Sequence, residues 1–146
     1  MKILLTGAGG QVGYELERSL QGLGQVVAVD RARMDLSDLD QVRDVIRAVS
    51  PSLIVNAAAY TAVDQAESEP ALARRINAEA PALMALEARK LGAAMVHYST
   101  DYVFDGRKAG AYTETDAPNP NNVYGQTKLD GEQAVEAALM NHRIPQ

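Results

Sequence analysis

The sequence predicts an α/β fold in which helices wrap both faces of a parallel sheet. Short apolar segments alternate with helical segments four times along the 146 residues. None of these apolar segments alternates cleanly between apolar and polar residues, which is typical of strands buried on both faces. Right-handed crossovers between such strands favour a doubly wound topology. No internal repeat or linker interrupts the pattern, so we expect one domain over residues 1–146.

The expected strands are short runs of apolar and β-branched residues, at 2–6, 25–30, 52–56 and 93–99. The expected helices carry apolar residues at helical spacing, at 11–23, 70–91 and 123–140. A further helix is expected between Ser37, as its N-cap, and Pro51, which forbids continuation. Within 70–91, Pro81 either starts a second helix or kinks the first. A long polar loop is expected from residue 100 to residue 122.

Composition excludes several classes of function. The chain has 14 Lys and Arg against 19 Asp and Glu, a net charge of −5, which disfavours a nucleic-acid partner. The absence of Cys excludes disulfide scaffolds, thiolate nucleophiles and Cys-based zinc sites. No apolar run approaches the ~18 residues that span a bilayer, and the first apolar stretch is too short for a secretory signal. We therefore expect a cytoplasmic globular domain with no membrane partner.

Three glycines at the first strand–helix junction form a G-x-x-G-x-x-G pattern. Gly7 permits a tight turn, Gly10 lets the backbone approach a phosphate, and Gly13 lets the helix pack closely. A pyrophosphate can meet the free N–H groups of the helix start at this position. The glycines alone are equally compatible with an ordinary turn.

Acidic and basic residues at the end of the second strand favour a dinucleotide-binding role for the glycine loop over an ordinary turn. Asp30 lies 20 residues beyond Gly10, where an acid can accept hydrogen bonds from an adenosine ribose. Arg31 and Arg33 follow at once and can instead hold a 2′-phosphate. The pattern predicts a Rossmann-like site for a nicotinamide dinucleotide and leaves NAD against NADP open.

Tyr124 and Lys128 lie four residues apart at the start of the last helix and share one face. An ammonium near a phenol favours the phenolate, so we expect the pKa of Tyr124 to be lowered and Tyr124 to donate a proton to a carbonyl oxygen. Thr100 can polarise the same carbonyl, and Asp101 can orient substrate hydroxyls. The alternative is that these residues only begin a helix and cap a strand. His97 is predicted to be a core side chain, and no metal site is expected from this chain alone.

Four stretches in order along the chain carry a family resemblance: LLTGAGGQVGYEL (4–16), VNAAAYTAVDQAESEP (55–70), VHYSTDYVFDG (96–106) and NVYGQTKLDGE (122–132). With these stretches the chain resembles the extended short-chain dehydrogenase/reductases, and within them the branch that reduces nucleotide sugars. The resemblance implies reduction of the 4-keto group of dTDP-4-dehydro-L-rhamnose by NADPH or NADH.

The resemblance also implies a role for individual residues. The catalytic set is Thr100, Tyr124 and Lys128, and Thr100 with Asp101 reaches the sugar nucleotide. The implied cofactor contacts are Gly7, Gly10, Gln11, Val12, Gly13, Asp30, Asp35, Leu36, Ala59, Tyr60, Thr61, Tyr124 and Lys128. Some family members bind Mg²⁺ through glutamates at a dimer contact, and Glu15 matches one such position.

Family members are roughly twice as long, and their second half binds the nucleotide of the substrate. We therefore expect a form truncated before the substrate lobe, with an unpaired fourth strand that favours self-association or a homodimer. Two alternatives remain open. One is a nucleotide-sugar epimerase or dehydratase of the same family. The other is a non-catalytic dinucleotide-binding subunit, like the regulatory beta subunit of methionine adenosyltransferase.

Overall fold

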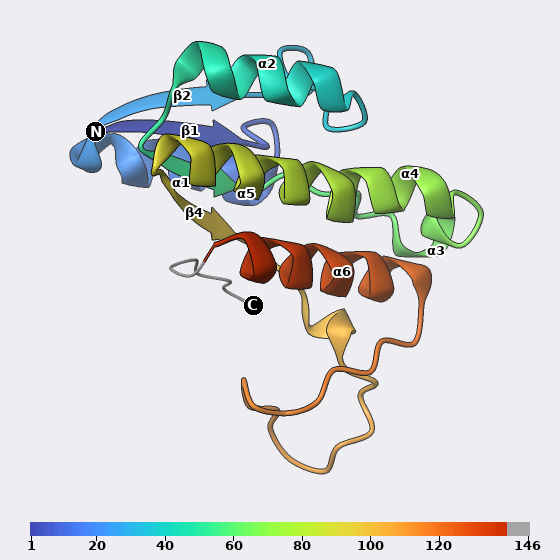
Figure 1. The fold of residues 1–146 in the computed structure, drawn as a ribbon. Helices are drawn as coiled ribbons and strands as arrows, with labels where there is room; N and C mark the ends of the chain where they lie inside the picture. The colour runs from blue at the N-terminus through green and yellow to red at the C-terminus, as the bar shows by residue number, and fades with distance from the viewer. Residues whose placement is uncertain (140–146) are drawn as a thin grey trace.

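The computed structural model describes residues 1–139 and confirms the parallel α/β architecture (Figure 1). The strands are β1 (Lys2–Thr6), β2 (Gln25–Val29), β3 (Leu53–Asn56) and β4 (Ala94–His97), in the order β2-β1-β3-β4. Every neighbouring pair is parallel. The strand ends differ from the predicted ones by one or two residues, as expected where ladders fray. Met140, the expected end of the last helix, lies outside the described residues.

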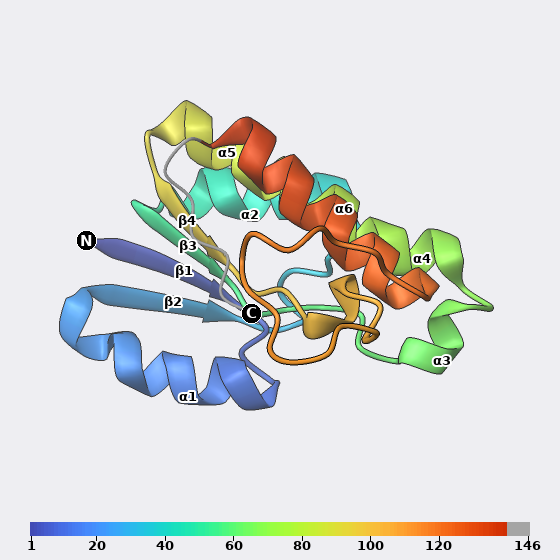
Figure 2. The same ribbon diagram turned by 90° about the horizontal axis from the view of Figure 1, so that it is seen from below.

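The helices cover the two faces of the sheet unequally. One face carries α1 (Gln11–Ser19), while α2 (Leu39–Val49), α5 (Ala80–Leu91) and α6 (Val123–Ala138) lie on the other (Figure 2). Successive strand residues alternate between these two layers. Leu4 and Ile54 pack with α2 and α5, whereas Leu5 and Val55 pack with the α1 side. Burial on both faces explains the unbroken apolar runs of the strands.

The first helix is shorter than predicted and presents a different face. It ends at Ser19 and continues as the 3₁₀ turn η1 (Leu20–Leu23). Val12, Leu16 and Leu20 are spaced to share one face of a helix. Leu16 and Leu20 pack on the core, but Val12 is 48% exposed. Val12 lies at the helix start, beyond the end of the strands, where the sheet no longer covers it.

The prediction of Ser37 as a helix N-cap is wrong, because Asp38 takes that position. The Asp38 carboxylate accepts a hydrogen bond from the Gln41 amide at 3.1 Å. Ser37 lies one residue before this cap position, and its hydroxyl instead donates to Asp35 Oδ1 at 2.7 Å. Both residue types are good caps, and the local turn decides between them.

The Ala-rich segment forms one helical run with a local widening near Pro81. The short helix α3 (Val63–Ala66) precedes it, and α4 (Pro70–Arg74) leads through the π-turn η2 (Arg75–Glu79) into α5 (Figure 1). Pro81 has no N–H for the carbonyl of Asn77, four residues earlier. Helix α6 approaches that carbonyl closely, because a Cβ added to Gly131 would lie 2.1 Å from Asn77 O. The widened turn therefore brings α5 and α6 together.

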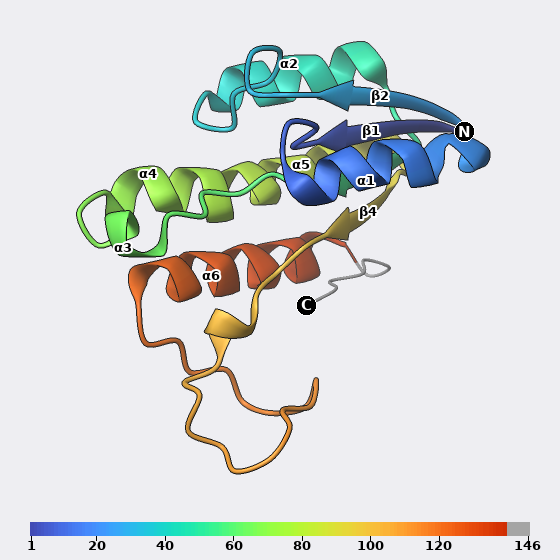
Figure 3. The same cartoon turned by 180° about the vertical axis from the view of Figure 1, so that it is seen from behind.

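The expected polar loop between β4 and α6 contains the 3₁₀ turn η3 (Asp101–Val103) and then extends away from the sheet (Figure 3). It returns to start α6 beside α3 and α4, so the first turn of α6 faces the carboxyl ends of the strands. None of the helices within residues 1–139 combines the length and apolar character needed to cross a membrane.

Candidate functional site

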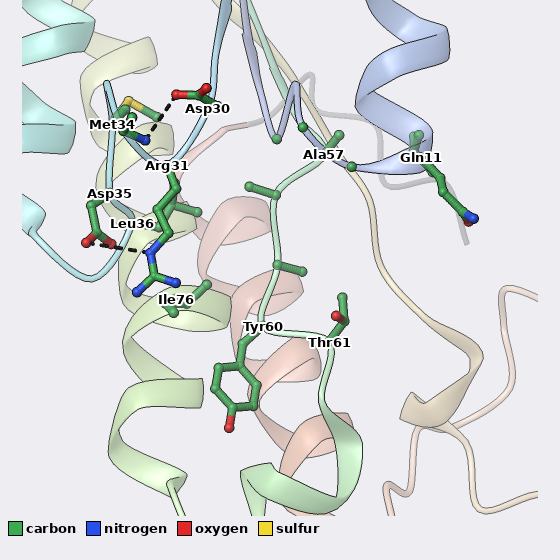
Figure 4. A pocket seen from close by; sticks show the side chains of 17 residues that line it. Gln11, Asp30, Arg31, Met34, Asp35, Leu36, Ala57, Tyr60, Thr61 and Ile76 are labelled. Atoms are coloured by element: carbon green, nitrogen blue, oxygen red, sulfur yellow. Dashed lines mark hydrogen bonds and ion pairs between the residues drawn. The ribbon is translucent and has the colours of Figure 1, made fainter.

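A cleft of about 830 Å³ opens at the carboxyl ends of β1, β2 and β3 (Figure 4). This is where ligands bind in open parallel α/β sheets, and the volume suits a cofactor-sized molecule. Ten of the predicted cofactor contacts line it: Gly7, Gly10, Gln11, Val12, Asp30, Asp35, Leu36, Ala59, Tyr60 and Thr61. Gly13, Tyr124 and Lys128 do not line the cleft. Sequence reasoning missed several other lining residues, Met34 and Ile76 among them.

The glycine loop has the tight geometry that its spacing predicts. Gly7 adopts φ +72°, and an added Cβ there would lie 2.8 Å from the Ala57 carbonyl carbon. At Gly13 an added Cβ would lie 1.9 Å from Gly7 O, so the start of α1 packs directly on the loop. Gly10 is the N-cap residue, and no side chain caps the helix. The first N–H groups of α1 therefore remain available to an anion at the positive end of the helix dipole.

The cleft fits a dinucleotide in shape and chemistry. The segment Ala57–Ala59 forms one wall with small side chains, so a ligand can pass close to the backbone. The diphosphate would meet the N–H groups at the start of α1, while Asp30 lies at the far end of the cleft, where the ribose of an adenosine belongs. Asp30 itself is held in place, because its Oδ1 accepts from the amides of Ala32 at 3.0 Å and Arg33 at 3.3 Å.

Beside Tyr60, the wall of the cleft is tied to α6 through the buried side chain of Asn77 in the π-turn η2. Its Oδ1 accepts from the Tyr60 amide at 2.8 Å, and its Nδ2 donates to Tyr60 O at 3.1 Å. The same Nδ2 lies 3.1 Å from Thr127 Oγ1, and the Thr127 hydroxyl donates to Tyr124 O at 2.8 Å. Asn77 therefore connects the cleft wall with the helix that carries Tyr124. Sequence reasoning missed this residue, although an Asn within an Ala-rich helix is an unusual choice.

Two acids that precede α4, Glu67 and Glu69, also position this corner. Glu69 Oε2 accepts the hydroxyl of Tyr60 at 2.8 Å, and Glu67 Oε1 accepts the Val123 amide at 3.0 Å. Burial and the neighbouring Glu69 raise the pKa of the Tyr60 phenol. The first contact fixes the aromatic side chain at the cleft, and the second fixes the first turn of α6.

The structure brings Thr100 and Tyr124 together. Asn122 caps α6 by accepting from the Gly125 amide at 2.7 Å, which places Tyr124 in the first turn, only 9% exposed. Thr100 lies near enough to Tyr124 to lower the pKa of its phenol. The Thr100 hydroxyl also lies 3.5 Å from Asp101 Oδ1, and the Tyr102 ring packs edge-on against Tyr124 with centroids 5.6 Å apart. Thr100 and Asp101 follow the end of β4, and Tyr124 approaches them from the first turn of α6.

The prediction of a lowered phenol pKa is wrong. Burial raises the pKa of Tyr124, the neighbouring Thr100 only partly offsets this, and Tyr102 and Asp101 raise the pKa further. Lys128 does not counter this, because its ammonium donates to Tyr98 O at 2.8 Å instead. Lys128 is 3% exposed, and burial lowers its pKa to about 8. Desolvation therefore dominates both groups.

A buried polar chain joins three strands beneath the cleft. In the register of the sheet, Asn56 on β3 lies beside Thr6 on β1 and beside His97 on β4. The Thr6 hydroxyl donates to Asn56 Oδ1 at 2.6 Å, so Asn56 Nδ2 faces His97 Nδ1 at 3.0 Å. Because Nδ1 then accepts, this pattern assigns the proton of the neutral ring to Nε2. His97 is a core side chain, as predicted.

Glu15, the position implied for a Mg²⁺ contact, is exposed on α1. Within residues 1–139, no three His, Asp or Glu side chains gather closely enough to hold a metal ion.

Comparison with known proteins places this geometry in a family. A curated dTDP-4-dehydrorhamnose reductase from Burkholderia thailandensis is 53% identical over 92% of this chain and 45% of that protein. A crystal structure of a dTDP-4-dehydrorhamnose reductase from Clostridium acetobutylicum matches with a TM-score of 0.94 and 41% identity, over 99% of this chain and 52% of that one. The crystal structure of the Bacillus anthracis dTDP-4-dehydrorhamnose reductase in complex with NADP matches with a TM-score of 0.91 and 38% identity, over 98% of this chain and 51% of that one.

The chain thus spans about half the length of the relatives it matches. The family model described as RmlD substrate binding domain matches residues 1–145. Because this match covers nearly the whole sequence, the chain belongs to the RmlD substrate binding domain family.

Proposed function

We propose that residues 1–146 are the dinucleotide-binding and acid–base half of an NAD(P)H-dependent reductase that converts dTDP-4-dehydro-L-rhamnose to dTDP-L-rhamnose. The observation that carries this proposal is the connection made by Asn77. It joins the cleft wall at Tyr60 to the helix of Tyr124, so a nicotinamide ring in the cleft would lie beside a buried phenol. The relatives named as this reductase support the substrate.

When bound, a reduced nicotinamide would supply the hydride for C4 of the sugar, and the ketone oxygen would gain a proton. Tyr124 gives that proton, because its raised pKa keeps the phenol protonated at neutral pH. The hydroxyl of Thr100, which lies near Tyr124, donates a hydrogen bond to the same oxygen. The C=O group becomes a C–O single bond that carries one new C–H bond and one new O–H bond. The phenolate left behind recovers a proton from solvent.

Lys128 and Asp101 complete the proposed machinery. Lys128 is buried beside Tyr98 and is oriented by the Tyr98 carbonyl, from where its remaining N–H groups can hold the nicotinamide ribose. Asp101 is exposed next to Thr100 and can orient a sugar hydroxyl. The proposed partners are the sugar nucleotide and a second copy of the chain, since β4 has a neighbour on one side only among the described strands. We place the reaction in the cytoplasm, where reduced dinucleotides are available.

The test measures binding and turnover separately. NADPH and NADH are titrated against the chain by nicotinamide fluorescence, and we expect saturable binding by both the wild type and Tyr124→Phe. Turnover is then followed by NAD(P)H absorbance with dTDP-4-dehydro-L-rhamnose, using the chain alone and fused ahead of the second half of the Burkholderia thailandensis relative. We expect the fusion to consume NADPH and Tyr124→Phe to slow it by about 100-fold or more.

Three outcomes would contradict the proposal. A wild-type chain that binds neither dinucleotide would overturn it. Equal rates for the fusion and its Tyr124→Phe variant would exclude Tyr124 as the acid. Sugar conversion without net consumption of NAD(P)H would indicate an epimerase or dehydratase instead.

A further inference from the structure

Arg31 and Asp35 form an ion pair at the adenosine end of the cleft. Arg31 Nε lies 4.0 Å from Asp35 Oδ2, with the Arg31 side chain 87% exposed and that of Asp35 34% exposed. Both residues line the cleft, whereas Arg33 does not. Figure 4 shows the guanidinium and the carboxylate facing one another at the rim. Of the two arginines that follow β2, only Arg31 is therefore placed to meet a ligand in the cleft.

The Asp35 carboxylate is held rigidly in this position. Its Oδ1 accepts from the Ser37 amide at 2.9 Å and from the Ser37 hydroxyl at 2.7 Å. The amide of Asp35 donates to Gln41 Oε1 at 2.8 Å, which anchors the backbone to α2. These bonds turn Oδ2 toward Arg31. The arginine is the more exposed partner, and the carboxylate is the one held by hydrogen bonds.

The charges that line the cleft oppose a phosphate at this end. Among the described residues that line it, the charged side chains are Asp30, Arg31 and Asp35, a net charge of −1. Asp30 is fixed by the amides of the following turn and suits a ribose with free hydroxyls. A 2′-phosphate would need the guanidinium of Arg31 as its counter-charge. That guanidinium is already engaged by Asp35.

We propose that Asp35 sets the preference of this site between a dinucleotide with a free 2′-hydroxyl and one with a 2′-phosphate, by competing with the phosphate for Arg31. This inference rests on the proposed dinucleotide function. Asp35 acts through Arg31 and is a specificity-determining, positioning residue. Its ion pair must open before Arg31 can bind the 2′-phosphate, while a ligand without that phosphate leaves the pair intact.

The experiment compares dissociation constants for NADPH and NADH, measured by nicotinamide fluorescence on the 146-residue chain. Asp35→Asn keeps an oxygen for the two bonds from Ser37 and removes the charge that holds Arg31. We expect it to raise affinity for NADPH relative to NADH by about fivefold, the upper range for a solvent-exposed pair. We expect Arg31→Ala to lower the same ratio by about tenfold, since a charge-assisted bond to phosphate is lost. Arg33→Ala is the matched control and is expected to change the ratio less than about twofold.

The double variant Arg31→Ala/Asp35→Asn tests whether Asp35 works through Arg31. Without the arginine, Asp35→Asn is expected to change the ratio less than about twofold, because coupled residues are not additive. Asp35→Ser provides a second variant if Asp35→Asn does not fold. An equal change in affinity for both dinucleotides, which a structural or adenine-binding role would give, overturns the inference. Binding of neither dinucleotide by the wild type overturns the proposed function, and this inference with it.

Discussion

The cleft and the Tyr124 corner are built in opposite ways, although they lie side by side. The cleft is made mainly of backbone, glycines and rim charges from the β1–α1–β2 unit, the turn after β2 and the end of β3, with Ile76 as a contribution from farther along the chain. The Tyr124 corner is made of buried side chains from distant parts of the chain. Lys128 reaches Tyr98 across 30 positions, and Asn77 reaches Thr127 across 50. Binding geometry here is local, whereas the proposed acid–base geometry depends on tertiary packing.

This difference predicts that the two regions fail differently. A change in the glycine loop acts through steric overlap between backbone segments, which cannot relax by a rotamer change. A change in the Tyr124 corner acts through unpaired or desolvated polar groups, whose cost depends on burial and on pH. Variants in each region therefore test whether dinucleotide binding and the packing of the Tyr124 corner can be altered independently.

The largest effect is expected from Gly13→Ala. The added Cβ would lie 1.9 Å from Gly7 O, so either α1 or the glycine loop must move. We expect a loss of about 3 to 5 kcal/mol in the free energy of unfolding, together with loss of NADPH binding. Urea denaturation and fluorescence titration measure the two effects.

Gly22→Ala is the matched control for Gly13→Ala. An added Cβ at Gly22 meets nothing within 4 Å, and the residue lies in η1, away from the cleft. It is expected to change stability by less than about 1 kcal/mol. Equal effects of the two substitutions would show that close packing of α1 on the loop is not what stabilises the cleft.

A smaller effect is expected from Asn77→Ala, which cuts the connection between the two regions. The change leaves the Tyr60 amide and carbonyl without their partner and removes the bond to Thr127. We expect a loss of about 3 kcal/mol in the free energy of unfolding, because two backbone groups lose their hydrogen bonds beneath the surface. At a temperature where the variant is folded, we also expect weaker binding of NADPH.

Asn121→Ala is the control for Asn77→Ala, since this exposed loop residue makes a single side-chain bond, to Asp105 O at 2.8 Å. It is expected to cost less than about 1 kcal/mol. If Asn77→Ala lowers stability but leaves the affinity for NADPH unchanged, the hydrogen bonds of Asn77 stabilise the fold and do not shape the cleft.

The same contrast explains how much could be predicted from the sequence. The parallel sheet, the tight turn at Gly7 and the close packing at Gly13 follow from local patterns, and the structure confirms them. The positions of Asp30 at the cleft and Thr100 beside Tyr124 also follow, because parallel strands end at one edge. Their chemical roles stay predictions.

The rest depends on contacts that no local pattern encodes. The hydrogen bonds of Asn77 depend on the π-turn before Pro81 and on the close approach of Gly131. Both arise from the packing of the helices, which the sequence does not show. The direction of the Tyr124 pKa shift was mispredicted because spacing places Lys128 on the same face but says nothing of the Tyr98 carbonyl. The N-cap position was mispredicted for a similar reason. Ser37 and Asp38 are both suitable caps in the sequence, and only the folded turn shows that Asp38 accepts from the Gln41 amide while Ser37 donates to Asp35.

The smallest effect concerns the pH dependence of stability at Lys128. Burial lowers its pKa from 10.5 to about 8, so the folded state gives up this proton before the unfolded state does. The cost of burying the ammonium is complete below about pH 8 and disappears as the pH rises toward the pKa of the unfolded chain. Wild type is therefore expected to gain about 2 kcal/mol relative to Lys128→Met between about pH 7.5 and pH 9.5, measured by urea denaturation. Lys90→Met, at a side chain 64% exposed, is the control, because that ammonium stays in water. Parallel pH profiles for wild type and Lys128→Met would contradict a buried ammonium, and with it the contrast between a solvated cleft and a desolvated corner.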